Sequence, residues 1–141
     1  MASVSEKAPL DRVRELCLSL PETSERLSHG QPSFFIREKK TFVMYLDDHH
    51  GDGRLALWLA APDGMQQAMV EAAPEHYFRP PYVGHRGWLG VRLDRDLAWD
   101  EIAGAIEDAY VTVAPRSLVE ASGLAGGRDG GEPNQGVAYP S

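Results

Sequence analysis

The sequence predicts an α+β fold in which helices pack on one face of an antiparallel sheet. Three observations lead to this class. Three segments have apolar residues at helical spacing, four have the alternation or the β-branched and aromatic content of strands, and short polar turns join the strands. The chain has 141 residues, of which 43% are hydrophobic and 25% charged, so it can bury one core. We expect a single domain over residues 1–120 and a glycine-rich tail over residues 121–141.

The chain begins with a predicted helix over residues 9–20. Pro9 suits the first turn of a helix, and Pro21 cannot continue one. Apolar residues recur every three or four positions, and Cys17 is one of them. A reactive thiol needs exposure and an electropositive neighbourhood, so we expect Cys17 in the core. Because it is the only cysteine of the chain, an internal disulfide bond is excluded.

Three strands are expected next, joined by polar turns. Residues 32–36 and 41–46 are rich in aromatic and β-branched residues, and residues 54–60 alternate between leucines and a face that carries Trp58. A shorter strand is expected around residues 26–28. Both faces of residues 54–60 are apolar, which indicates a central strand covered on one side by helices.

The second half of the chain is expected to form two helices, a strand between them, a shorter strand before it and a final helical turn. In chain order these elements span residues 62–73, 76–78, 88–93, 96–113 and 115–120. Asp100 and Glu101 fall in the first turn of the last long helix, where carboxylates complement the helix dipole.

Charge is distributed unevenly along the chain. The formal net charge is −7, yet residues 76–95 hold four arginines and one aspartate. This is the only basic block on an acidic chain. Nucleic-acid binding without sequence preference depends mainly on neutralising phosphates, so the overall charge opposes it, and only a local patch could serve.

The candidate site is the stretch from Arg79 to Arg92 within this basic block. Two prolines hold its start extended, and two glycines then bracket His85 and Arg86 in a turn that projects both side chains. In the following strand, alternation places Trp88, Gly90 and Arg92 on one face, where the glycine leaves room for a ligand to approach the backbone. An exposed tryptophan beside arginine suits stacking on a base and pairing with phosphate. The commoner explanation of such clusters is structural, with the indole covering the core edge and the arginines paired with carboxylates.

Two other polar stretches have structural explanations. The turn over residues 37–40 carries Lys39 and Lys40, which could contact phosphates, although such charges usually belong to a solvated hairpin turn. The turn over residues 47–53 is rich in Asp and His but lacks a known metal-ligand spacing, so we expect a loop and no metal. Neither a nucleotide-binding loop nor a nucleophile–base pair is visible, so we expect no cofactor and no catalysis.

Two further expectations concern the location of the protein and its C-terminal tail. No apolar run approaches membrane-spanning length, and the N-terminus lacks the pattern of a signal peptide, so we expect a cytoplasmic protein without a membrane partner. Residues 123–141 carry 6 of the 14 glycines. We expect residues 137–140 to dock on their own domain or on a neighbouring molecule.

Several segments, taken in order, resemble the YjbR/MmcQ family, once catalogued as a domain of unknown function. The matching stretches are Leu18-Ser-Leu-Pro-Glu-Thr23, Gly30-Gln-Pro-Ser-Phe34, the run from Pro81 to Asp94, Trp99-Asp-Glu-Ile102, and Asp108-Ala-Tyr110 with Val113-Ala-Pro-Arg116. The resemblance covers about residues 8–120.

The resemblance implies a fold similar to that of CyaY, the bacterial frataxin, and DNA binding through a pair of hairpins, as is predicted for the family. The acidic first helix of CyaY is not matched, since residues 9–20 hold only Asp11 and Glu15 as acids, and iron binding is therefore not implied. The turn over residues 37–40 also lacks the glycines that are common in family hairpins.

The leading hypothesis is a DNA-binding or nucleic-acid-associated protein. Phosphate contacts would come from the basic block, stacking contacts from its aromatic residues and secondary contacts from the hairpin lysines. These residues are Arg79, His85, Arg86 and Arg92, then Tyr82 and Trp88, then Lys39 and Lys40.

Two alternatives use the same segment. One is a pocket for a small anionic or aromatic ligand, lined by His29, Tyr82, His85, Arg86 and Trp88. The other is a protein-interaction module that uses Trp88 and the tail. A concave pocket at Trp88 would favour the ligand, whereas a flat or convex surface there would favour DNA.

Overall fold

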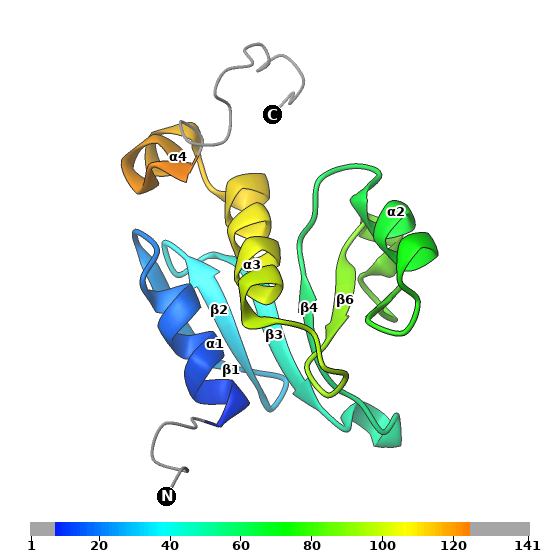
Figure 1. Ribbon diagram of the computed structural model, residues 1–141. Coiled ribbons are helices and arrows are strands. Elements are labelled where there is room, and N and C mark those ends of the chain that lie inside the picture. The colour runs from blue at the N-terminus through cyan, green and yellow to red at the C-terminus, as the bar shows by residue number, and fades with distance from the viewer. Residues whose placement is uncertain (1–7, 125–141) are drawn as a thin grey trace, which may run out of the picture.

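A six-stranded antiparallel sheet forms the centre of the computed structural model, which describes residues 8–124 (Figure 1). The strands follow the spatial order β1-β2-β3-β4-β6-β5. Their bounds are β1 Thr23–Ser28, β2 Gln31–Ile36, β3 Lys40–Asp47, β4 Leu55–Leu59, β5 Tyr77–Phe78 and β6 Leu89–Arg92. The helices of this part of the chain are α1 Pro9–Leu18, α2 Met65–Ala72, α3 Trp99–Val113 and α4 Arg116–Ser122, with the 3-10 turns η2 His49–Gly51 and η3 Gly84–Arg86. The predicted α+β class is confirmed.

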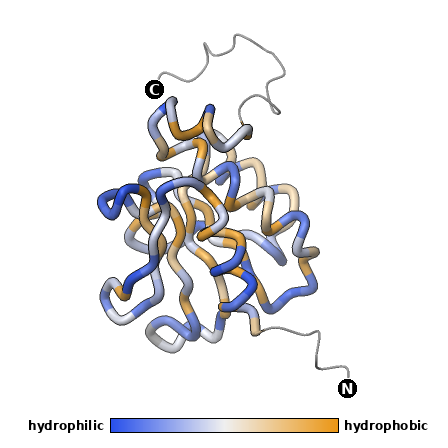
Figure 2. Tube along the Cα trace, turned by 90° about the vertical axis from the view of Figure 1, so that its left-hand side faces the viewer, coloured by the Kyte–Doolittle hydropathy of each residue, from blue (hydrophilic) through white to orange (hydrophobic). Residues whose placement is uncertain are grey.

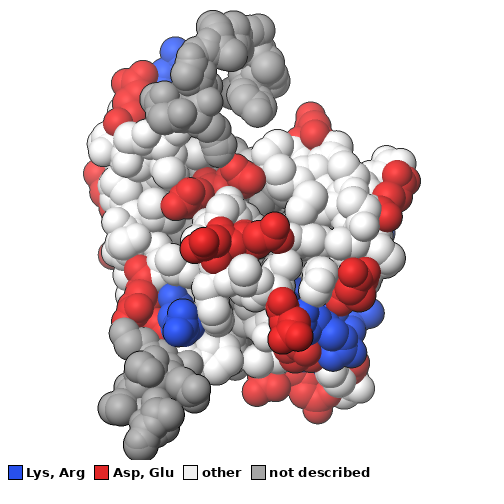
Figure 3. Space-filling model, viewed as in Figure 1, with Lys and Arg blue, Asp and Glu red and all other residues white. Residues whose placement is uncertain are grey.

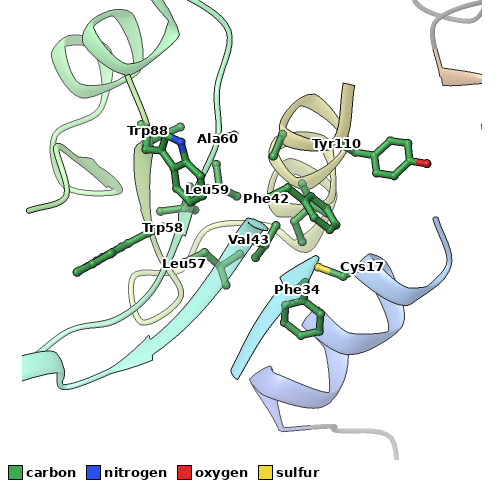
Figure 4. Packing of buried hydrophobic residues seen from close by; sticks show 14 of the residues in the cluster. Cys17, Phe34, Phe42, Val43, Leu57, Trp58, Leu59, Ala60, Trp88 and Tyr110 are labelled. Carbon is green, nitrogen blue, oxygen red and sulfur yellow. The ribbon is translucent and has the colours of Figure 1, made fainter. Parts of the chain in front are cut away.

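Helices α1 and α3 cover one face of the sheet, whereas α2 lies beside β5 and β6 at its far edge (Figure 1). The ring of Tyr110 in α3 meets that of Phe42 edge-on at 5.7 Å, and the Tyr110 hydroxyl donates to the carbonyl oxygen of Pro21 at 2.8 Å. Figure 4 shows these rings with Val43 and Cys17 in the core between sheet and helices. Cys17 is buried, as predicted, and this burial raises the pKa of its thiol well above the ordinary value.

Strand register decides which side chains face the helices. Val43 pairs with Leu59, and both belong to the helix-covered core. One residue further along β3, Met44 pairs with Trp58, which in turn pairs with Gly90 of β6. Because successive side chains of a strand point to opposite faces, this second row lies on the face that α1 and α3 leave open.

The helices are shorter than their apolar spacing predicts, and local backbone chemistry explains why. The expected helix over residues 9–20 ends at Leu18, and after it the Leu20 N–H closes a turn on the Cys17 carbonyl oxygen at 3.2 Å, which also accepts from the Thr23 hydroxyl. Gly64 has a φ of 84°, so α2 begins only after it. Asp96 has a φ of 53°, which excludes it from α3.

The hairpin turns on both sides of β2 are tight. His29 and Gly30 have φ values of 53° and 79°, and Arg37 and Glu38 have φ values of 53° and 61°, the signs that type I′ turns require. The second turn is closed by the Lys39 N–H, which donates to the Ile36 carbonyl oxygen at 3.1 Å. It therefore forms a short, well-defined hairpin despite its lack of glycine.

Hydrophobic stretches run through the middle of the molecule, and hydrophilic ones gather at the loops (Figure 2). None of the helices in residues 8–124 is long and apolar enough to cross a membrane. The docking expected of residues 137–140 concerns a part of the tail that lies outside the described residues.

Candidate functional site

A groove with a volume of about 1200 Å³ follows the open face of the sheet and extends to the last turn of α3, where Thr112 and Val113 line it. Its floor is made of sheet residues that alternate with those of the helix-covered core. These floor residues are Met44, Leu46, Trp58, Ala60 and Trp88. Between Lys40 and Leu46 the groove follows β3 for about 20 Å, at the rise of 3.3 Å per residue of a strand. This volume lies above the roughly 300–1,000 Å³ of most small-molecule pockets, so the groove has room for an extended ligand.

The segment from Pro80 to Trp88 forms one wall of the groove and is fixed in place by α2. The Gln66 side-chain amide donates to the carbonyl oxygens of Gly84, at 2.8 Å, and Trp88, at 2.6 Å. These bonds satisfy two backbone acceptors of a loop that has no strand partner there. The opposite wall comes from the β1–β2 turn, with His29, and from the β2–β3 turn.

Tyr82 stands out on the first wall because its backbone is strained while its ring is exposed. Its φ is 65°, and the Val83 N–H donates to the Pro81 carbonyl oxygen at 2.6 Å across it, which is a γ-turn of the strained kind. The side chain is 68% exposed. Strain of this kind costs about 1–3 kcal/mol and gathers at functional sites.

The Tyr82 ring belongs to an aromatic cluster in the groove. Its centre lies 6.1 Å from that of His49 and 6.3 Å from that of Trp58, and the last two rings are 5.0 Å apart. Trp58 is only 3% exposed, and its buried indole N–H has no hydrogen-bond partner among the described residues. The cluster therefore offers an aromatic surface, mainly the ring of Tyr82, to a ligand in the groove.

We expect Tyr82→Gly to be more stable than Tyr82→Ala by about 1 kcal/mol, because only glycine adopts positive φ without steric cost. Both variants lose the ring contacts with His49 and Trp58, so the comparison isolates the backbone. Urea denaturation of the two variants measures the difference. An alanine variant as stable as the glycine variant would show that residue 82 is not held at positive φ.

The cations of the groove gather at one of its ends. Lys40 opens β3, Ala60 follows β4 and Trp88 precedes β6, and in an antiparallel sheet these positions share an end. Lys39 precedes Lys40, and the Arg86 guanidinium carbon lies 5.3 Å from the centre of the Trp88 ring. No Asp or Glu is found among the described residues that line the groove.

The acidic character of the chain appears on the other side of the sheet. Figure 3 looks onto the face covered by α1 and α3 and shows acidic side chains spread across it, with basic ones in smaller patches. The groove thus combines Lys39, Lys40 and Arg86 on the face that the helices leave open, in a protein of net charge −7. Among its described lining residues, the groove offers an anion three cations and no carboxylate.

The exposed Trp88 of the nucleic-acid hypothesis is wrong, and the structural alternative, in which the indole covers the edge of the core, is confirmed. Its side chain is 5% exposed and belongs to the buried core, since Trp88 lies at the end of the sheet with Arg86 over its ring and the wall segment around it. It borders the groove as part of its floor and offers little free ring surface.

Arg92 is also not free to bind phosphate in the groove. Its guanidinium donates to Asp94 at 3.0 Å and 3.2 Å, and it does not line the groove. The pair raises the pKa of Arg92 and lowers that of Asp94, because each charge stabilises the other through the hydrogen bonds. Here the structural explanation of a basic cluster applies.

Two further residues of the basic block lie outside the groove lining. Arg79 donates to the Gln66 side chain at 3.3 Å, and its stem packs against Gly84. His85 is exposed on the 3-10 turn η3 and does not line the groove. Of the residues predicted as binding residues, the groove brings together Lys39, Lys40, Tyr82, Arg86 and Trp88.

The space beside Gly90 belongs to a side chain of the protein and not to a ligand. A Cβ atom at this position would lie 2.5 Å from two carbons of the Phe78 ring. Phe78 is the cross-strand partner of Gly90 in the β5–β6 pair, and the Arg54 guanidinium stacks on that ring at 4.0 Å. The expectation that Gly90 allows a ligand to approach the backbone is therefore wrong.

Sequence reasoning missed most of the groove floor and His49. His29, named for a ligand pocket, does line the groove. The doubly apolar pattern of residues 54–60 was the available signal, because it showed that the Trp58 face of β4 must also be covered.

Among residues 8–124, no group of three or more His, Cys, Asp or Glu side chains is placed to hold a metal ion.

Comparison with known proteins concerns the chain as a whole. The family model described as YjbR matches residues 18–112. The crystal structure of the Deinococcus radiodurans protein DR2400, with a DUF419 domain, is similar with a TM-score of 0.65. The two chains are 19% identical over 84% of this chain and 87% of the other, a likeness that shows the fold alone. No curated protein matches this sequence.

Proposed function

The chain belongs to the YjbR family, and from that premise we propose that it is a nucleic-acid-binding protein whose ligand lies in the groove of the open sheet face. One observation carries the proposal. Three cations and an exposed tyrosine ring line the same concavity, and no acidic side chain is found among its described lining residues.

The distribution of charge favours the groove over other surfaces as the site of nucleic-acid binding. A protein of net charge −7 repels a polyanion on average, so any attraction has to come from a local concentration of cations. Lys39, Lys40 and Arg86 supply that concentration, and Tyr82 adds a stacking surface elsewhere in the same groove. Grooves that bind nucleic-acid strands combine these two features.

The proposal assigns no catalytic role to the groove. Binding requires only phosphate pairing and stacking, and the lining residues supply both. A cytoplasmic location, where nucleic acids are accessible, is part of the proposal.

Titration of a fluorescein-labelled oligonucleotide, followed by anisotropy at about 50 mM salt, tests the proposal, because phosphate contacts are strongest at low salt. We expect Arg86→Ala to weaken binding about fivefold, the value of one exposed charge pair. Arg116→Ala removes the same charge from the exposed surface of α4, outside the groove, and is expected to change affinity less than about twofold. Absence of binding by the unaltered protein, or equal losses in the two variants, would contradict the proposal.

A small phosphorylated aromatic ligand is the second candidate. The surface at Trp88 is concave, which is the outcome expected for a small ligand and not for DNA, and the arrangement along the groove also favours this candidate. The cations lie where β3 begins, whereas His49 and the Tyr82 ring lie toward its other end. A ligand with phosphate at one end and a ring at the other, such as a nucleotide, matches this separation. Isothermal titration with ATP distinguishes the candidates, since tight binding of ATP and none of the oligonucleotide supports only the second.

A further inference from the structure

We propose that the groove is selective for single-stranded nucleic acid over duplex, and that it holds one unpaired base against Tyr82 with the neighbouring phosphates at Lys39, Lys40 and Arg86. This inference rests on the proposed nucleic-acid function and specifies the form of the ligand.

Accessibility of the Tyr82 ring is the first argument. The side chain is 68% exposed, while the two tryptophans of the groove floor are 3% and 5% exposed. Tyr82 is therefore the principal stacking surface. A base can stack on it only when its own π-face is free, which is true of an unpaired base and not of one inside a duplex.

The shape of the β2–β3 hairpin is the second argument. Reading a duplex through its major groove requires a protruding helix or two-stranded ribbon. The tip of this hairpin is short and is held to the edge strand β1, because Arg37 pairs with Glu22 at 2.7 Å and Arg26 donates to the Glu38 carbonyl oxygen at 3.2 Å. It does not form a free wing that could enter a groove of DNA.

The position of the charges is the third argument. The cations line a concavity, so a flexible strand can reach them, whereas a stiff duplex would first meet the rims. At the β2–β3 rim a duplex would encounter the exposed carboxylate of Glu38, which is next to Lys39 in the chain. Like charges in contact oppose binding.

The decisive experiment has three parts, all measured in the same anisotropy assay with fluorescein-labelled oligonucleotides. They are a single strand of about 16 nucleotides without self-complementarity, the same strand annealed to its complement, and a competition with unlabelled ATP. We expect the single strand to bind at least about tenfold more tightly than the duplex, the value of one stacked base. Tyr82→Ala should lose about tenfold in affinity for the single strand and nothing for the duplex, and Tyr82→Phe should retain the affinity.

The matched control is Leu27→Ala, because Leu27 has the same 68% exposure, lies on β1 and does not line the groove. It should bind both probes as the unaltered protein does. Duplex binding as tight as single-strand binding would overturn the single-strand inference and leave nucleic-acid binding in place. Binding of neither probe would overturn the proposed function itself. Single-strand binding that Tyr82→Ala does not affect would overturn the assignment of the base to Tyr82.

Discussion

Replacing Lys39, Lys40 and Arg86 together by alanine is expected to weaken oligonucleotide binding roughly 100-fold. Each exposed charge pair contributes up to about 1 kcal/mol, and three such contributions correspond to about two orders of magnitude. The three side chains line one end of the groove, and no Asp or Glu is found among the described lining residues. Removing the three cations should therefore weaken contacts with the same bound phosphates. Anisotropy titration at several salt concentrations measures both the affinity and its salt dependence.

The salt dependence of the binding constant provides a second, independent test of this prediction. For a single strand that neutralises three phosphates, the logarithm of the binding constant should fall with that of salt concentration with a slope of about −2. The triple variant should bring this slope close to zero. The control is a second triple variant that removes the same charge from surfaces outside the groove lining, with Arg12→Ala, Arg95→Ala and Arg116→Ala. If this control weakens binding equally, net charge and not the groove determines the affinity.

Much of the sheet could be predicted from sequence because strand alternation is a local property. The pattern around Trp88 placed Leu89 and Val91 toward the core, and both are fully buried. The short strands β1 and β5 were harder to predict from sequence, because their formation depends on the strands they pair with more than on their own composition. Helix ends were misplaced at Leu18 and Gly64, where a local turn and a positive φ lie at the boundary.

The candidate site was only partly predictable, and the reason is the long-range packing of its walls. The sequence indicated that Tyr82, Arg86 and Trp88 lie near one another, but not that the segment bearing Tyr82 and Arg86 would pack along a groove across β3 and β4. It also could not show that Asp94, two residues after Arg92, would neutralise that arginine. Lys39 and Lys40, considered secondary, are central to the groove because the sheet topology brings their hairpin opposite Arg86.

The second prediction with a large expected effect concerns the stability of the fold at Gly90. Gly90→Ala is expected to lower the free energy of unfolding by about 1–3 kcal/mol, because the new methyl group would overlap the Phe78 ring in a packed site. The strand cannot easily move aside, since Gly90 is paired with Trp58 on one side and with Phe78 on the other. Urea denaturation of the variant gives the loss as a shift in the unfolding midpoint.

A double-mutant cycle with Phe78→Ala tests the cause of that loss. Phe78→Ala is itself destabilising, since it removes the ring that covers Gly90 and stacks on Arg54. In its background, however, Gly90→Ala has no ring to meet, so the two losses should fall short of additivity by about 1–2 kcal/mol. Gly90 does not line the groove, so oligonucleotide affinity should be unchanged in the folded Gly90→Ala protein. A variant of normal stability with weakened binding would instead restore Gly90 as the point where a ligand approaches the backbone.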